Sequence, residues 1–320
     1  MKTKQKNAVA TVKKTAGVKK TSLKVYFKRN YDMYLMIIPG IVFLILFRFV
    51  PLYGMSIAFK DYNMSQSIAD SPGVGFKWFR VLFENPDFFR VMRNTIVLNL
   101  CDLVTCFGGS IVFAILINEV NNAKYKRVVQ TISYLPHFLS WVVVGGLITQ
   151  ILNPSSMLML GIFNMLGVEP TNLLLKPGNF YLIATFGEAW KSIGWGTILY
   201  LAAMSGIDPG LYEAARIDGA GKIRQIIHIT LPGIKFIVVT QLLMKIGQMM
   251  GVGFEKVFSL QNDMILSTSE VFSTWNYKMG IINWNMSLST ALSFFEAVVN
   301  FMLVFIFDRV AKWLGEEGLF

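Results

Sequence analysis

Six long apolar runs constrain this chain more than any other feature. A helix that crosses a membrane needs about 20 mostly apolar residues, because each residue adds about 1.5 Å toward a hydrocarbon core about 30 Å thick. Only helices and closed barrels satisfy the backbone in lipid, and these runs are continuous rather than alternating, which predicts an all-α polytopic protein. The six transmembrane helices are expected at Leu35–Phe59, Thr95–Asn118, Val128–Leu152, Phe180–Met204, Ile234–Phe254 and Leu288–Trp313.

The composition fits a membrane protein and argues against several soluble classes. Hydrophobic residues make up 54% of the chain and charged residues 15%, against roughly a quarter charged in soluble domains. The net charge of +11 lies mostly outside the apolar runs, so we do not expect nucleic acid as a partner. Two Cys and two His are too few for a disulfide framework or a zinc site, so no bound metal is predicted.

The first 34 residues form a basic tail with ten Lys or Arg and one acidic residue, Asp32. Such a tail cannot bury a core, so we expect it to be disordered and drawn to anionic lipid. It is too long and too basic before its apolar run to be a removable signal peptide. The positive-inside rule places it in the cytoplasm, and six crossings return the C-terminal tail, residues 314–320, to the same side. Residues 35–313 then form the transmembrane domain.

The cytoplasmic segment 206–232, between the fourth and fifth apolar runs, is longer than a simple connection needs. Asp208 followed by Pro209 is a good start for a helix, because Asp caps the first turn and Pro suits its first position. Gly219 and Gly221 stand where that helix is expected to stop. A second short apolar stretch follows, so the segment predicts two short helices joined by a glycine turn.

The first of these short helices has the character of a docking element. Ala214 and Ala215 allow close approach to a partner, and Glu213, Arg216 and Asp218 can pair with charges across an interface. The alternative, from the residues alone, is an amphipathic segment that lies on the membrane surface without a partner.

The same loop resembles the EAA signature of permeases from ATP-binding-cassette (ABC) importers. The residues that carry the resemblance are Glu213, Ala214, Ala215, Gly219, Ile229, Leu231 and Pro232, with Asp218 beside the glycine. The resemblance implies the type I importer (MetI-like) permease fold and a coupling helix that inserts into a separate cytoplasmic ATPase. The sequence contains no Gly-x4-Gly-Lys-Ser/Thr phosphate loop. We therefore expect a non-catalytic subunit that binds no cofactor, with ATP and Mg²⁺ held by two partner ATPase subunits.

Further motifs are similar to carbohydrate permeases of the MalF type. They are Pro51–Asn63, Asn85-Pro86, Arg93-Asn94-Thr95, Leu135-Pro136, and Asn153-Pro154 followed by Gly161, Asn164 and Gly167. Gly253–Val257 with Gln261-Asn262 is closer to the LplB and YteP branch, which is associated with complex oligosaccharides. The resemblance implies an oligosaccharide substrate, a second and non-identical MalG-like permease, an extracellular or periplasmic solute-binding protein, and the bacterial cytoplasmic membrane.

Several ionisable residues fall inside the predicted spans. An unpaired charge is costly there, so we expect each of them to be paired or functional. They are Arg48, Asp102, Glu188, Lys191, Lys245 and Glu296. Glu188 and Lys191 are three residues apart and are expected to neutralise each other. Arg48 is expected either to pair with Asp102 or Glu296, or to line a water-filled path with them.

A path for sugars needs groups that bond to hydroxyls and flat aromatic surfaces for the C–H faces of the rings. Candidates in the inner spans are Asn99, Trp190, Trp195, Tyr200, Gln241, Gln248 and Asn300. Trp and Tyr also occupy the membrane interfaces for reasons unconnected with substrate, so belt or packing roles stay open for them.

The loops Lys60–Met92 and Glu255–Ser287, with Trp78, Trp275 and Trp284, are the expected outer surfaces for the binding protein. A second hypothesis is a self-sufficient ion-coupled carrier or channel that uses the intramembrane charges as a relay. Such a carrier does not need a docking helix, and so has no use for Glu213, Ala214, Ala215 and Gly219 at their spacing in the cytoplasmic loop. A membrane-embedded enzyme is disfavoured, because the sequence shows no nucleophilic side chain matched with a general base.

Overall fold

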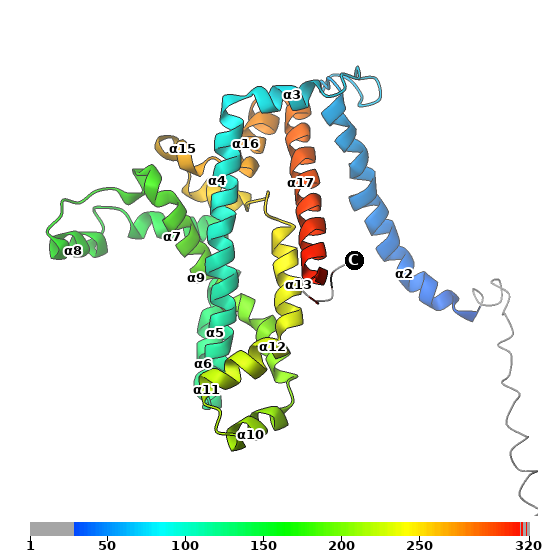
Figure 1. The fold of residues 1–320 in the computed structure, drawn as a ribbon. Helices are drawn as coiled ribbons and strands as arrows, with labels where there is room; N and C mark the ends of the chain where they lie inside the picture. Colours follow the sequence, from blue (N-terminus) through cyan, green and yellow to red (C-terminus); the bar gives the residue numbers. More distant parts are fainter. Residues whose placement is uncertain (1–28, 314, 316–317, 319–320) are drawn as a thin grey trace, which may run out of the picture. The chain divides into compact units, whose positions relative to one another are not determined.

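The computed structural model describes residues 29–313, Gly315 and Gly318 (Figure 1). Predictions for the basic tail up to residue 28, and for most of segment 314–320, lie outside these residues. Every regular element in the described part of the chain is a helix, which confirms the all-α class. The chain divides into two compact units, Met1–Gly54 and Met55–Phe320, and each is described by itself.

The first predicted span is confirmed as one helical stretch of 29 residues, Tyr31–Phe59. It begins four residues before the predicted Leu35 and is assembled from an α-helix, a π-helical turn and a 3₁₀ segment. These are α2 (Tyr31–Leu44), η1 (Ile45–Phe49) and η2 (Val50–Phe59). Arg48 lies in η1, in the first unit.

The second span is a continuous helix of 33 residues, Pro86–Asn118, and starts nine residues before the prediction. The Asn85 side chain accepts a hydrogen bond from the Asp87 amide and Pro86 takes the first position, so the helix begins there. Its parts are α4 (Pro86–Asp102), η3 (Leu103–Gly108) and α5 (Gly109–Asn118). The sixth prediction is confirmed by α17 (Met286–Trp313), 28 residues long.

The third predicted span is wrong as a continuous helix. Helix α6 (Ala123–Tyr134) continues through η4 (Leu135–Phe138), and the chain then turns by 100° into α7 (Trp141–Ile151). Ser140 caps the new helix, because its hydroxyl accepts from the Val143 amide. The prediction took the run of apolar residues as one helix and ignored this capping signal.

The fifth predicted span, Ile234–Phe254, is also wrong as a continuous helix. Helix α13 covers only Lys235–Ile246 and meets the preceding helical segment Lys222–Gly233 at a bend of 63°. That segment consists of α11 (Lys222–Gln225), η7 (Ile226–Thr230) and α12 (Leu231–Gly233). After Ile246 the chain unwinds over residues 247–253 and then forms α14 (Phe254–Leu260), which packs against α7.

Two asparagine side chains satisfy the backbone of the unwound segment 247–253. Asn300 Oδ1 accepts from the Met250 amide at 2.9 Å, and Asn99 Nδ2 donates to the Met249 carbonyl oxygen at 2.9 Å. Non-helical backbone is tolerated at membrane depth only where protein or a water-filled cavity satisfies it. Both asparagines were predicted from sequence as path residues, and both support backbone here.

Helix α9 (Phe180–Ser205) corresponds to the fourth predicted span and contacts α4, α5, α6, α13 and α14. Its neighbours approach closely: a Cβ on Gly194 would lie 2.1 Å from the Ser133 carbonyl oxygen. Among the described residues, three helices are long and apolar enough to cross a membrane, or up to five if each bent pair is one span. With 26 residues α9 is long enough as well, but it is less apolar because protein surrounds much of it.

Short helices occupy one end of the second unit, opposite α10 (Figure 1). They include α3 (Lys77–Glu84), α15 (Leu266–Ser269) and α16 (Phe272–Tyr277), and further short segments are α8 (Met157–Leu166), η5 (Leu173–Leu175), η6 (Pro177–Asn179), η8 (Asp263–Ile265) and η9 (Lys278–Ile282). Much of the predicted loop Glu255–Ser287 is therefore helical. Trp275 is buried in a core with Phe88 and Phe272, whereas Trp284 is 65% exposed.

Asn94, from the Arg93-Asn94-Thr95 motif, ties this end of the unit together. Its amide nitrogen donates to the carbonyl oxygens of Ser267 and Glu270, and its oxygen accepts from the Tyr181 hydroxyl at 2.7 Å. The Asn94 side chain is fully buried, and its bond to the Glu270 carbonyl oxygen is shielded from water. The motif that resembles sugar permeases thus fastens α15 to α4 and α9.

Candidate functional site

Two adjoining cavities lie among α4, η3, α9 and α13, and they share Cys106, Ser192 and Lys245. The larger, about 480 Å³, is called here the aromatic cavity, and its other lining residues are Phe107, Ser110, His137, Trp195, Gly196, Ile198, Leu199, Tyr200 and Gln241. The smaller, about 300 Å³, is called the charged cavity, and its other lining residues are Asn99, Asp102, Leu103, Trp141, Glu188, Gln248, Met249, Gly251, Val252, Gly253 and Lys256.

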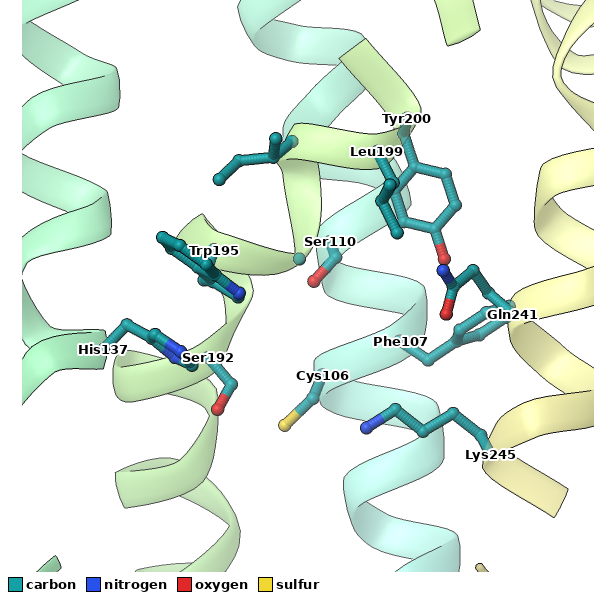
Figure 2. A pocket seen from close by; sticks show the side chains of 12 residues that line it. Cys106, Phe107, Ser110, His137, Ser192, Trp195, Leu199, Tyr200, Gln241 and Lys245 are labelled. Carbon is teal, nitrogen blue, oxygen red and sulfur yellow. The ribbon is translucent and has the colours of Figure 1, made fainter. Parts of the chain in front are cut away.

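Stacked rings form one wall of the aromatic cavity (Figure 2). The His137 and Trp195 rings are parallel within 3°, with centroids 4.5 Å apart. Lys191 helps to position this wall, because its Nζ donates to the His137 carbonyl oxygen at 2.6 Å. Cys106 and Lys245 reach into the cavity from η3 and α13, on the side opposite the stacked rings (Figure 2). A flat aromatic face opposite polar groups suits a sugar ring.

A buried ion pair dominates the charged cavity. Lys256, which is 2% exposed, contacts the Asp102 Oδ2 atom, and its Nζ lies 3.7 Å from Glu188 Oε2. The Ser192 hydroxyl donates to the other Glu188 oxygen. Because Asp102, Glu188 and Lys256 come from α4, α9 and α14, the pair joins three elements. Such a cluster is costly to break, since each partner then leaves a charge without compensation.

The expected pairing of Glu188 with Lys191 is wrong. The Glu188 carboxylate accepts a hydrogen bond from the Ser192 hydroxyl and faces Lys256. The Lys191 ammonium instead donates to the His137 backbone carbonyl oxygen. Two residues three positions apart on a helix can form an ion pair, but here both side chains contact other partners instead. Glu296 has one buried carboxylate oxygen without a hydrogen-bond partner among the described residues. The proposed roles of Arg48 stay predictions.

Lys256 is the cavity residue that sequence reasoning missed. It was assigned to an outer loop because the fifth span was taken to run to Phe254. The signal was present, since Lys256 belongs to the Gly253–Val257 motif of the oligosaccharide permease branch. The break at residues 247–253 turns α14 back onto α7 and carries Lys256 inside.

The predicted path residues divide between the cavities and other places. Asn99 and Gln248 line the charged cavity, whereas Trp195, Tyr200 and Gln241 line the aromatic cavity. Trp190 is 49% exposed and lines neither of the two. Asn300 serves the Met250 backbone.

The unwound segment 247–253 forms part of the charged cavity through Gln248, Met249 and the three residues that follow Met250. Discontinuous helices commonly build substrate sites in transporters, because their free backbone groups become available at mid-membrane. The charged cavity is therefore lined by the kind of unwound segment that builds substrate sites in many transporters.

The loop between α9 and α13, predicted to be cytoplasmic, contains its predicted helix. Helix α10 covers Pro209–Ile217, and the Asp208 carboxylate caps it by accepting from the Gly210 amide at 2.9 Å. At the other end, the Ala220 amide donates to the Ala215 carbonyl oxygen at 2.8 Å and Gly219 has φ +74°. This is the Schellman ending, in which glycine takes the left-handed position.

The outer surface of α10 is unusually apolar for an exposed segment. Ile217 is 87% exposed and Leu211 is 53% exposed. Of the predicted coupling residues, Glu213, Ala214, Asp218 and Gly219 are exposed and Ala215 is half-buried, while Ile229, Leu231 and Pro232 lie in the second helical segment.

Two contacts hold α10 and α11 to the rest of the unit. The Tyr212 and Thr230 hydroxyls are 3.0 Å apart, and Lys222 forms an ion pair with Glu119 at the end of α5. The loop is therefore mechanically connected to the long second span.

A family comparison decides which class of transporter this is. Residues 108–316 match the family described as "Binding-protein-dependent transport system inner membrane component". The chain belongs to this family. It is a multi-pass protein of the cytoplasmic membrane and a permease subunit of an ABC importer.

Individual relatives agree with the family. The permease is 42% identical over 288 residues, 90% of each chain, to "Polygalacturonan/rhamnogalacturonan transport system permease protein YteP" of Bacillus subtilis (strain 168). It is 39% identical over 306 residues, 96% of each chain, to "Protein LplB" of the same organism. These matches confirm the branch to which the Gly253–Val257 motif points.

A solved structure shares the fold of the permease. A chain in the crystal structure of a bacterial alginate ABC transporter, in complex with an alginate pentasaccharide-bound periplasmic protein, superposes with a TM-score of 0.85. The identity is 33%, and the match covers 93% of this permease and 99% of that chain.

Proposed function

We propose that this permease carries an oligosaccharide through the aromatic and charged cavities, driven by a separate ATPase that grips α10. The observation that carries the proposal is an unwound span that lines a cavity, together with a capped and exposed helix, α10, at the end of the unit that is predicted to be cytoplasmic. The permease itself would bind no cofactor. ATP and Mg²⁺ would be held by two partner ATPase subunits, so this chain would be non-catalytic.

The stacked rings and amides of the cavities support a sugar as cargo. The His137–Trp195 stack offers a flat face for C–H groups, while Gln241 and Gln248 offer both donors and acceptors to hydroxyls. The relative YteP is named for polygalacturonan and rhamnogalacturonan, and the matched structure includes an alginate pentasaccharide bound to its periplasmic protein.

The coupling role of α10 rests on its exposed apolar and charged residues. Ile217 and Leu211 would enter a cleft of the ATPase, with Glu213 and Asp218 pairing at its rim. Closure of the two ATPase subunits on ATP would then drag α10 and, through Lys222 and Glu119, move the second span. The cavities would open alternately to the two sides.

The remaining partners follow from the same arrangement. A second permease, non-identical and MalG-like, would supply the other half of the path, and an extracellular or periplasmic solute-binding protein would deliver the cargo. Both termini would face the cytoplasm, with the basic tail on the anionic surface of the lipid bilayer.

Reconstituted uptake tests the proposal. The permease, its partner permease, the ATPase and the binding protein are placed in liposomes and offered a mixture of short neutral and uronate-containing oligosaccharides. We expect accumulation of at least one of these sugars that requires internal ATP and the ATPase subunit. Uptake driven by an ion gradient without ATP would instead identify an ion-coupled carrier.

A further inference from the structure

Two lysines line the charged cavity, and they differ in what they contact. Lys256 is buried and engaged by Asp102 and Glu188. Lys245, on α13, lines both cavities and forms no ion pair or hydrogen bond within the described part of the chain. An ammonium group in a recess at membrane depth is costly unless a counter-charge reaches it.

The carboxylates near Lys245 form their ion pairs with Lys256, although the Asp102 charge also acts on Lys245 and Asp102 Oδ1 has no hydrogen-bond partner among the described residues. Lys256 contacts Asp102 Oδ2, and Glu188 receives the Ser192 hydroxyl while facing the same lysine. The remaining groups that line both cavities beside Lys245 are the Cys106 thiol and the Ser192 hydroxyl, which are neutral. A positive charge thus stands at the junction of the two cavities, with a stacked aromatic wall across the larger one (Figure 2).

We propose that Lys245 is the binding group for a carboxylate on the transported sugar, so that the path selects uronate-containing oligosaccharides. The sugar ring lies against the Trp195 and His137 faces, and its carboxylate reaches across to the Lys245 ammonium. The inference rests on the proposed function. It adds to that function the residue that binds the cargo and the charge that the cargo carries.

A matched pair of sugars tests the binding role. One is the trimer of galacturonate, and the other is the same trimer with each carboxylate reduced to a primary alcohol. In the reconstituted importer, Lys245→Gln should lower uptake of the uronate trimer by roughly tenfold, the usual worth of a charge-assisted hydrogen bond. Uptake of the reduced trimer should change little, and Lys245→Arg should keep most of the uronate uptake.

Lys235→Gln is the control variant, because Lys235 begins the same helix but lines neither cavity. It should leave the ratio of uronate to reduced trimer as in the wild type. Since every variant is assayed with the same binding protein, selection by that protein cancels from the comparison.

A second measurement reads the charge of the cavity without any sugar. The sequence has two cysteines, so Cys101→Ser leaves Cys106, at the junction of the cavities, as the only thiol of this chain. In the assembled importer, its reaction rates with a sulfonate-bearing and a trimethylammonium-bearing methanethiosulfonate are compared by mass spectrometry of this chain. Lys245→Gln should lower the anion-to-cation rate ratio, on the order of tenfold.

The outcomes separate the inference from the proposed function. Equal loss of both trimers in Lys245→Gln, or an unchanged thiol rate ratio, would overturn the carboxylate role. So would an importer that accumulates only neutral sugars with ATP, although the proposed function would then stand. If ATP drives no accumulation of any sugar in the mixture, the proposed function fails as well.

Discussion

Two of the ion pairs that fasten later segments of the permease to its long second span are built in opposite ways. Lys256 meets Asp102 beside the charged cavity, with the two side chains 3% and 19% exposed. Lys222 meets Glu119 behind the α10 loop, with side chains 60% and 28% exposed. The first pair lies in a low-dielectric recess, and the second lies largely in water.

This difference indicates what each pair does. Breaking a buried ion pair is costly, because it leaves a charge without compensation. Lys256 therefore holds α14 against α4 and α9 in one arrangement. An exposed pair contributes little to stability and exchanges readily with water or with another partner. The cavity wall is therefore fixed, whereas the Lys222–Glu119 pair connects the loop to the span with little contribution to stability and can re-form as the loop moves.

The largest expected effect is that of removing the buried cation. Lys256→Met leaves the Asp102 carboxylate without its counter-charge, which should lower the free energy of unfolding by about 3–5 kcal/mol. Thermal unfolding of the purified complex measures it. Adding Asp102→Asn to Lys256→Met should restore part of the loss, because the stranded charge is then gone.

Lys278→Met is the matched control for Lys256→Met. Lys278 is 53% exposed and 3.7 Å from Glu270, which keeps its second partner Arg90. The change should lower the free energy of unfolding by about 1 kcal/mol or less. Equal losses in the two variants would show that burial does not distinguish these lysines.

A smaller effect is expected at the end of α10. Gly219→Ala meets no atom within 4 Å, but it forces alanine into φ +74°, at a cost of about 1–2 kcal/mol. The last turn of α10 should loosen, so ATP-driven uptake should fall while the complex stays assembled. Vesicle uptake measures the first quantity and size-exclusion chromatography the second.

Gly221→Ala separates the backbone argument from a general effect of alanine. Gly221 has φ −67° and equally open surroundings, so this variant should transport as the wild type does. A loss as large as that of Gly219→Ala would mean that the left-handed turn is not what matters.

The smallest effect sharpens the comparison of the two ion pairs. Lys222→Gln removes the exposed pair with Glu119 and should change the free energy of unfolding by about 0–1 kcal/mol. Thermal unfolding of this variant and of Lys256→Met, measured under the same conditions, gives the difference between their stabilities directly. If the Lys222 variant proved as unstable as the Lys256 variant, the loop would have to be regarded as fixed.

Local signals let the sequence predict α10 well. Asp208, Pro209 and Gly219 each act on neighbouring backbone groups, so the start and the end of the helix follow from adjacent residues. The first, second and sixth spans were also found, because long apolar runs need no tertiary partner to be recognised.

The charged cavity could not be predicted in the same way. The break after Ile246 depends on Asn99 and Asn300, which lie far away in the sequence and satisfy the unwound backbone. Without that break, Lys256 would be assigned to an outer loop and Glu188 would be paired with Lys191. Hydropathy detects apolar runs, but it does not detect which distant polar groups replace a helical hydrogen bond.

Cross-linking from α10 tests the central claim most directly. Ile217, which is 87% exposed, is replaced by a photoreactive amino acid in the assembled and active importer, and Met165 of α8, 91% exposed, is the control position. We predict a covalent product between position 217 and the ATPase subunit, and none with that subunit from position 165. A complex that transports sugar with ATP, but in which position 217 cross-links only to lipid, would contradict the account.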